Sequence, residues 1–210
     1  MLYVMSWQKS NMFSGIIRQI GEVRTINTHS SGVRLSVEIG EFANTVKLGD
    51  SIAHNGVCLT VAEIKRSVAT YDLLEETCKK TTLGNLQLGK KLNLELSLKL
   101  GDAIDGHLVY GHVDEIGEIT KIEKTNSATR ITVQPSLAFM NYIAPQGAIA
   151  VDGVSLTIAD FTKEVFTVSL VPYTVQHTAF CDSVVGDRVN LEADMMAKYV
   201  QSLDKKRCYE

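Results

Sequence analysis

An internal repeat limits the fold of this chain more than any other feature. Residues 52–95 align without a gap to residues 149–192, with 16 identical residues in 44 positions at an offset of 97. The match continues upstream at an offset of 96, where Gly15 aligns with Gly111 and residues 21–23 align with 117–119. Two copies are too few for a solenoid, which needs three or more repeats to bury a core. Each copy is therefore expected to close on itself.

Apolar and polar residues alternate through most of the repeat. The period of two runs through residues 34–39, 92–98 and 166–170. It predicts strands with one face on a core and the other toward solvent, so Asn93 and Glu95 are expected to face water. About six short strands in each copy, with no long helix between them, predict an all-β chain of small closed barrels or sandwiches.

Turns and helices can be placed from the same pattern. Asn55-Gly56 and Asp152-Gly153 lie between apolar runs at matched positions, which predicts two tight hairpin turns. A helical turn is expected near Leu83 to Leu86. Residues 195–203 have apolar positions three and four apart, which predicts an amphipathic helix that the first copy lacks. Its apolar face has two possible partners, its own domain or identical helices around a symmetry axis.

Composition excludes several classes of protein. The net charge is −3 and no basic stripe is present, so a nucleic-acid partner is not expected. No apolar stretch reaches the roughly 18–20 residues that span a bilayer, and the first residues lack the features of a signal peptide. The four cysteines form no CxxC pair, so we expect no zinc site and reduced thiols in a cytoplasmic protein.

A few side chains stand out as chemical candidates. His107 and His112 are five residues apart, which on a strand places them on opposite faces, so a shared metal is not expected. Each is either a structural histidine or a group with a chemical role. Cys58 is either a small buried residue or part of a binding site. Ser155 replaces it in the second copy, and a hydroxyl needs a partner when buried, so the exchange favours a site that lines a ligand.

Several motifs, in order, resemble those of the riboflavin synthase family. They are Met12-Phe13-Ser14-Gly15-Ile16-Ile17, Asn55-Gly56-Val57-Cys58-Leu59-Thr60, Glu76-Thr77 with Thr81-Thr82-Leu83-Gly84, Gly106-His107-Leu108-Val109 with Gly111-His112-Val113-Asp114, and Asp152-Gly153-Val154-Ser155-Leu156-Thr157. The resemblance covers about residues 12–203. It implies two six-stranded Greek-key β-barrels and a C-terminal helix that assembles a homotrimer.

The resemblance also implies a reaction and a division of the chain. Two molecules of 6,7-dimethyl-8-ribityllumazine exchange a four-carbon unit and give riboflavin and a ribitylamino-pyrimidinedione, with no metal or redox cofactor. Residues 1–11 are an N-terminal extension, 12–108 and 109–194 are the two lumazine-binding barrels, and 195–210 are the trimerisation helix and tail. The implied partners are the substrate, two further copies of the chain and lumazine synthase.

Two substrate pockets follow from the resemblance. The first is lined by Gly15, Ile16, Ile17, Cys58, Leu59, Thr60, Asp72, Leu73, Leu74, Glu75, Glu76 and Thr77. The second is lined by Gly111, His112, Val113, Gln146, Ser155, Leu156, Thr157, Ser169, Leu170, Val171, Pro172 and Tyr173. The first barrel of one subunit is expected to face the second barrel of its neighbour.

The implied catalytic residues are His112, Cys58, Ser51, Phe13 and Asp194. His112 is expected to act as the acid–base group and Cys58 as a polar or nucleophilic contact to the pteridine ring. Asp194 is expected to orient a partner or a water molecule, and Ser51 and Phe13 to support them.

Three residues depart from the family pattern, namely Tyr110, Asp105 and Gln146. The last stands where many members carry lysine, although a glutamine still donates and accepts hydrogen bonds. Two rival functions use similar barrels: a lumazine protein that binds a chromophore without turning it over, and a flavin-binding barrel of an electron-transfer protein. The second needs a nucleotide-binding domain that this chain does not show.

Overall fold

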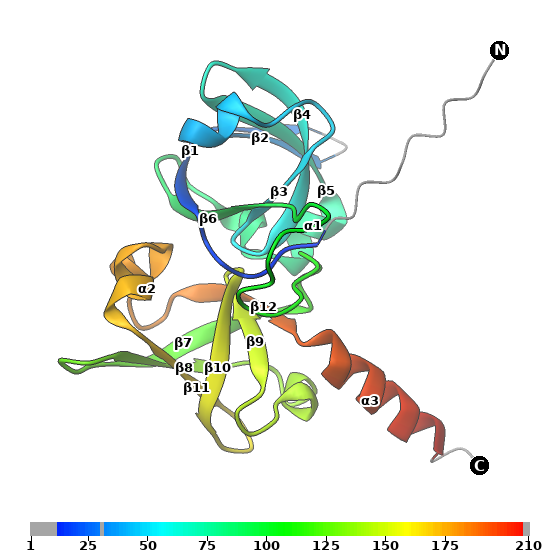
Figure 1. Ribbon diagram of the computed structural model, residues 1–210, viewed down its shortest axis with the longest axis vertical. Coiled ribbons are helices and arrows are strands. Elements are labelled where there is room, and N and C mark those ends of the chain that lie inside the picture. Colours follow the sequence, from blue (N-terminus) through cyan, green and yellow to red (C-terminus); the bar gives the residue numbers. More distant parts are fainter. Residues whose placement is uncertain (1–11, 30–31, 208–210) are drawn as a thin grey trace.

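The chain folds into two closed β-barrels, one after the other in sequence (Figure 1). The computed structural model describes residues 12–29 and 32–207. The expected extension at residues 1–11 lies outside these described residues. The two barrels and the helix that follows them confirm the all-β fold expected from the repeat.

The first barrel contains six antiparallel strands. They are β1 (Gln19–His29), β2 (Gly32–Glu38), β3 (Ser51–His54), β4 (Val57–Lys65), β5 (Val68–Leu74) and β6 (Lys91–Leu96), in the spatial order β1-β2-β5-β4-β3-β6. The inward residues of each strand, such as Leu35 and Val37 of β2, form one buried core. The order is that of a Greek key, since β2 pairs with β5 and β3 pairs with β6.

The second barrel repeats this arrangement strand by strand. Its strands are β7 (Glu115–Lys124), β8 (Thr129–Gln134), β9 (Ala148–Val151), β10 (Val154–Phe161), β11 (Phe166–Leu170) and β12 (Arg188–Ala193). Read from β7, their order is β7-β8-β11-β10-β9-β12, which matches the first barrel element for element. A separate apolar core fills this barrel. The duplication in sequence is therefore a duplication of the complete fold.

The two predicted hairpin turns are confirmed, and they meet between the barrels. Asn55 and Gly56 have φ values of 44° and 76°, and Asp152 and Gly153 have 45° and 76°. A Cβ atom on Gly56 would lie 2.7 Å from the backbone nitrogen of Gly153. Glycine is therefore required for the turns to pack back to back.

The expectation that Asn93 and Glu95 face solvent is wrong. Both side chains are buried, as are Asn190 and Glu192 at the matched positions of β12. Nδ2 of Asn93 donates to the carbonyl of Asp152 at 2.9 Å, and Nδ2 of Asn190 donates to the carbonyl of Asn55 at 2.8 Å. The polar faces of β6 and β12 thus form a hydrogen-bonded interface between the barrels, related by an approximate two-fold axis.

The short helices differ from the prediction more than the strands do. A 3-10 turn, η2 (Thr82–Asn85), occupies the region expected to be helical near Leu83. Two further helices were not predicted, α1 (Glu75–Lys80) and α2 (Pro172–Gln176). The remaining 3-10 turns are η1 (Gly40–Asn44), η3 (Phe139–Tyr142) and η4 (Ala179–Asp182).

The predicted C-terminal helix is present as α3 (Met195–Arg207), which extends away from the second barrel (Figure 1). Its first turn is capped by Asp194, whose Oδ1 accepts from the Met196 amide at 2.9 Å. Across the described part of the chain, no helix is long and apolar enough to cross a membrane.

Candidate active site

Two segments cross between the barrels, and they carry most of the residues expected to form the site. We call residues 13–17 the first strap and residues 109–113 the second strap. Phe13 and Val109 pair with each other, with N···O distances of 2.7 and 3.0 Å in the two directions. From this pair, the first strap continues onto the outer surface of the second barrel, and the second strap continues onto the outer surface of the first barrel.

The second strap lies on the first barrel. The Cys58 amide in β4 donates to the Gly111 carbonyl at 3.0 Å, and Val113 packs against the core of this barrel. Gly111 has a φ of 73°, and a Cβ atom there would lie 2.6 Å from Cβ of Cys58. Only glycine fits this crossing.

The first strap lies on the second barrel in the same way. The Ser155 amide in β10 donates to the Gly15 carbonyl at 2.7 Å, and Ile17 packs against the core of the second barrel. Gly15 has a φ of 74°, and a Cβ atom there would lie 2.6 Å from Cβ of Ser155. The expected grouping, with the first strap beside Cys58 and the second beside Ser155, is therefore wrong: the straps are exchanged.

The two histidines do not lie on a strand, so the expected placement on opposite strand faces does not apply to them. His107 and His112 both lie in the irregular connection between the barrels. Nδ1 of His107 is 2.7 Å from Oγ of Ser155, and burial lowers the pKa of this imidazole while the charge of Asp194 opposes the shift. The structure thus joins His107, which was not among the predicted catalytic residues, to the strap-covered part of β10.

His112 occupies a different environment from His107. Its ring is exposed, with the ring of Tyr110 stacked 6.3 Å away, and its amide donates to Oε2 of Glu192 at 3.1 Å. The side chain is therefore accessible to a ligand on the outer face of the first barrel. Its position beside Gly111 places it on the strap that contacts Cys58.

Cys58 is half-buried, and burial raises the pKa of its thiol. A hydrogen bond with Ser51 opposes this shift, whereas the negative charge of Glu192 adds to it. The structure thus places Ser51 in contact with Cys58. The thiol form is favoured near neutral pH, so the geometry suits a polar contact better than a nucleophile.

Several predicted lining residues point into the cores instead of outward. Leu59, Leu73, Leu156 and Leu170 are buried within the two barrels, and Phe13 is buried between them. These residues can offer only backbone groups to a ligand. By contrast, Thr60 and Thr157 are exposed on the outer faces of β4 and β10.

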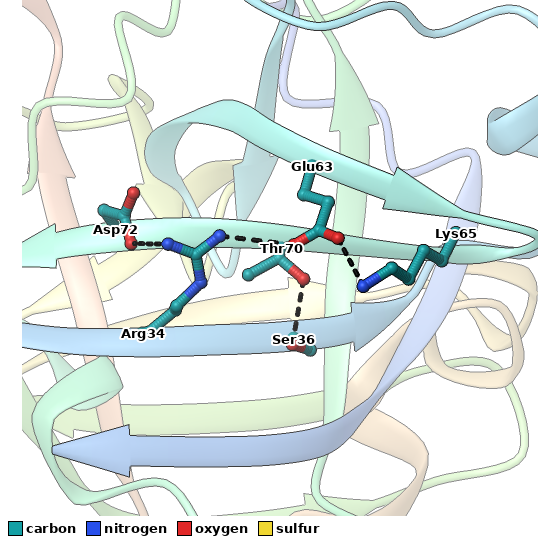
Figure 2. Close-up of polar contacts among 6 residues, drawn as sticks. All are labelled: Arg34, Ser36, Glu63, Lys65, Thr70 and Asp72. Carbon is teal, nitrogen blue, oxygen red and sulfur yellow. Dashed lines mark hydrogen bonds and ion pairs between the residues drawn. The ribbon is translucent and has the colours of Figure 1, made fainter.

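The end of β5 and the start of α1 form one side of the candidate site on the first barrel. Asp72 is exposed, and its Oδ1 accepts from Arg34 at 3.2 Å, while Arg34 also contacts Glu63 at 3.3 Å (Figure 2). Leu74 is exposed, and Glu75, Glu76 and Thr77 form the first turn of α1. This surface therefore combines an apolar side chain with a fixed set of charges.

The second barrel has a related but less charged surface. Ser169 takes the place of Asp72 and lies opposite Arg130 of β8 in the strand register. Val171 is exposed like Leu74, Pro172 begins α2, and Tyr173 stacks on His177 with ring centroids 3.9 Å apart. The two faces therefore resemble each other in shape and differ in charge.

The remaining predicted residues lie near cavities, in turns or on a strap. Ser51 lines a cavity of about 430 Å³ in the first barrel, and Asp194 lines a matched one of about 750 Å³ beside α3. Gln146 is exposed in the turn before β9, with a φ of 59°. Ile16 is half-buried on the first strap, and Asp105 pairs with Arg18 at 3.3 Å.

No metal site is evident among residues 12–29 and 32–207, since no three histidine, cysteine or acidic side chains gather there. Sequence reasoning missed Glu95 and Glu192, whose carboxylates bind the straps. Their identity at matched positions was the available signal. Alternation alone predicts that both residues lie on the solvent face of a strand.

Comparison with known proteins supports a specific family. The lumazine binding domain matches the chain twice, over residues 14–97 and 110–194. Riboflavin synthase of Bacillus subtilis (strain 168) is 38% identical over 189 residues, which cover 90% of this chain and 88% of that protein. Riboflavin synthase of Brucella abortus (strain 2308) is 40% identical over 197 residues, covering 91% and 98%.

Solved structures with a similar fold bind related ligands. The crystal structure of LumP complexed with riboflavin has a TM-score of 0.81 and 21% sequence identity, and covers 86% of this chain and 98% of that chain. The structure of LumP complexed with 6,7-dimethyl-8-(1'-D-ribityl) lumazine has a TM-score of 0.79 at 20% identity, with the same coverage. At this level of identity, the similarity establishes the shared two-barrel fold.

Proposed function

Because this chain belongs to the riboflavin synthase family, we propose that it catalyses the dismutation of two molecules of 6,7-dimethyl-8-ribityllumazine. One molecule donates a four-carbon unit and leaves as 5-amino-6-(D-ribitylamino)uracil. The other accepts the unit and becomes riboflavin. The observation that carries this proposal is the family match over both barrels, each of which presents a strap-covered outer face.

The duplicated fold suits a reaction that consumes the same molecule twice. One barrel face carries Cys58 under the second strap, and the other carries Ser155 under the first strap. Two related sites can hold two identical molecules in different roles. Fixing two reactants in a productive approach can contribute roughly 7–11 kcal/mol toward lowering the barrier.

We assign the proton transfers to groups on the exchanged straps and the strands beneath them. The C7 methyl group of one substrate must lose a proton before it can attack the other. His112 is exposed beside the face that carries Cys58, so it can take up this proton. A positioned acid–base group of this kind is worth about 10²–10⁴-fold in rate. Cys58, with Ser51 bonded to its thiol, supplies a polar contact to the ring.

On the second barrel, we assign a supporting role to the His107–Ser155 pair and to Asp194. The proposed lining residues of each site are those named from the resemblance, with the straps exchanged between the barrels. Leu59, Leu73, Leu156 and Leu170 take part through their backbones, because their side chains lie in the cores.

We also propose that the chain forms a homotrimer in which the first barrel of one subunit faces the second barrel of the next. Helix α3 carries four exposed apolar side chains, Met196, Tyr199, Val200 and Leu203, each at least 64% exposed. An apolar face of this size is costly in water and is covered when identical helices pack together. Two neighbouring subunits would then bring together the face that carries Cys58 in one and the face that carries Ser155 in the other.

The proposal extends to the cellular setting. We place the enzyme in the cytoplasm, which fits the free thiols of the three described cysteines, Cys58, Cys78 and Cys181. Lumazine synthase is the proposed protein partner, since its product is the substrate.

Riboflavin formation tests the proposed function directly. The purified protein is incubated with the lumazine substrate, without added cofactor or metal, and riboflavin is followed by absorbance. We expect product from the wild type and a loss of at least about tenfold in rate for Cys58→Ala and His112→Ala. Cys181→Ser, which changes an exposed cysteine of η4, serves as a matched control for Cys58→Ala.

A binder without turnover is the competing function, because LumP shares the fold and its structures contain lumazine or riboflavin. Binding of the substrate with no riboflavin formed would support this function instead. It would refute the proposed dismutation.

A further inference from the structure

Two buried glutamates at matched positions bind the straps. Glu95 in β6 and Glu192 in β12 are each 4% exposed. Oε1 of Glu95 accepts from the amide and hydroxyl of Ser14 at 2.7 and 2.8 Å, and its Oε2 accepts from the Gly15 amide at 3.0 Å. Oε1 of Glu192 accepts from the Tyr110 amide at 2.7 Å, and its Oε2 accepts from the His112 amide at 3.1 Å.

Each glutamate acts on the site of the opposite barrel. Glu192 belongs to the second barrel, but the strap that it binds bonds to Cys58 of the first barrel through Gly111. Glu95 belongs to the first barrel, but its strap bonds to Ser155 of the second barrel through Gly15. A carboxylate, a strap and a site strand therefore form one continuous set of contacts on each side.

We propose that Glu192 and Glu95 are positioning residues, each of which fixes the strap that completes the substrate site of the opposite barrel. The inference rests on the proposed function for its effect on turnover. It does not rest on it for the geometry of the strap.

The chemistry of the contact requires a carboxylate of this length. All the groups that point at each glutamate are donors, and an ionised carboxylate only accepts. A glutamine keeps one accepting oxygen but turns its NH₂ group toward the other strap amide. This NH₂ group and the amide that faces it are both donors, so neither has a partner. An aspartate keeps both acceptor oxygens but is one methylene shorter, so it can satisfy the strap only if the strap moves.

The second strap has an additional support that the first lacks. Oδ2 of Asp114 accepts from the Ala193 amide at 2.9 Å and from Nζ of Lys198 at 2.7 Å. This ion pair connects helix α3 to the residue that follows the second strap, and both side chains are partly exposed. The matched position in the first copy is Arg18, which is exposed and bonds to Asp105. The two straps are thus held to different degrees.

Cys58 reports on the position of the second strap, and Glu192→Asp separates this effect from the loss of the charge. Burial beside the second strap raises the pKa of its thiol, and the charge of Glu192 adds to this shift. Replacing Glu192 with glutamine should therefore shift the pH midpoint of Cys58 alkylation downward, whereas Glu95→Gln should leave it unchanged. General destabilisation would speed alkylation at every pH and at every cysteine, without moving the midpoint of Cys58 alone.

The experiment compares the full-length wild type, Glu192→Gln, Glu95→Gln and Glu192→Asp. Iodoacetamide alkylation is measured for each cysteine by peptide mass spectrometry between about pH 7 and pH 10, with Cys78 and Cys181 as internal references. Riboflavin formation is measured in parallel. We expect a lower Cys58 midpoint in Glu192→Gln and Glu192→Asp, and the wild-type midpoint in Glu95→Gln. We expect turnover to fall about ten- to hundredfold in both glutamine variants, as for other misplaced site groups.

The outcomes separate this inference from the proposed function. Equal Cys58 midpoints in Glu192→Gln and the wild type, or equal shifts in both glutamine variants, would overturn the positioning role. If Glu192→Gln does not fold, Glu192→Asp must still lower the Cys58 midpoint, because it keeps the charge but displaces the strap that covers the thiol, and it must lose turnover. Wild-type values in that variant would also overturn the positioning role. A wild type that makes no riboflavin refutes the proposed function, while the alkylation result still tests the strap.

Discussion

Replacing Asp152 with asparagine should remove a pH-dependent weakness from the contact between the barrels. Asp152 is 9% exposed, its Oδ1 accepts from the Asn190 amide at 2.8 Å, and burial raises its pKa from 3.8 to about 7. The charge of Asp187 adds to this shift, and Lys90 and the Asn190 amide oppose it. The matched residue in the first copy is Asn55, which accepts from Asn93 in the same way at 2.7 Å. Asparagine therefore fits this turn.

The sign follows from proton binding. Below about pH 4 the carboxyl is protonated in both the folded and the unfolded chain. Between about pH 4 and pH 7 the unfolded chain loses the proton while the folded chain keeps it, so the free energy of unfolding falls as the pH rises. Each pKa unit is worth about 1.36 kcal/mol, so a shift from 3.8 to about 7 sets an upper limit of about 4 kcal/mol.

Urea unfolding of the wild type and Asp152→Asn across this pH range measures the effect. We expect the stability difference in favour of the variant to grow between about pH 4 and pH 7 and then to level off. Asn55→Asp should produce the opposite change, because it places a second carboxyl at the same kind of site. A stability difference that stays constant with pH would refute the reasoning.

Three further predictions concern other parts of the chain. His54 is fully buried and burial lowers its pKa to about 4, so stability should be lost as the pH falls from about 6.5 toward 4. His54→Val should reduce this loss by up to about 3 kcal/mol, measured by acid unfolding followed by circular dichroism. An unchanged acid transition would contradict this prediction. Gly111→Ala should lower the free energy of unfolding by more than the roughly 1–2 kcal/mol of a left-handed residue, and lower turnover as well, because its Cβ would meet Cys58. Gly89→Ala, with a φ of 78° and no atom within 4 Å, should lose only the strain energy. Equal losses of stability would show that the strap does not need the close approach. Val200→Ser should weaken the proposed trimer, seen as a lower mass in light scattering at low protein concentration, and an unchanged mass would indicate that α3 does not form the subunit contact.

Much of the fold could be predicted because its signals are local. Asn55-Gly56 and Asp152-Gly153 specify turns by their own backbone preferences, and the turns were found where expected. The three- and four-residue spacing after Asp194 specified α3 in the same way. Helices α1 and α2 were missed because each spans six residues or fewer and has no buried stripe. The Lys79–Glu75 and Lys80–Glu76 pairs were the available signal for α1.

The candidate site was harder to predict because it depends on contacts between the barrels. Alternation marks Glu95 and Glu192 as polar, but it cannot say whether the polar face meets water or another barrel. The exchange of the straps is likewise set by distant contacts, such as that of Gly15 with Ser155. The repeat shows that both barrels have equivalent strands, but it does not show which strap lies on which barrel.

The stoichiometry of the reaction tests the central claim most directly. Substrate loss, riboflavin and 5-amino-6-(D-ribitylamino)uracil are quantified together in one reaction with the purified chain and no added cofactor. A dismutation predicts one molecule of each product for every two molecules of 6,7-dimethyl-8-ribityllumazine consumed. Bound lumazine that is never consumed, or riboflavin formed without the second product, would contradict it.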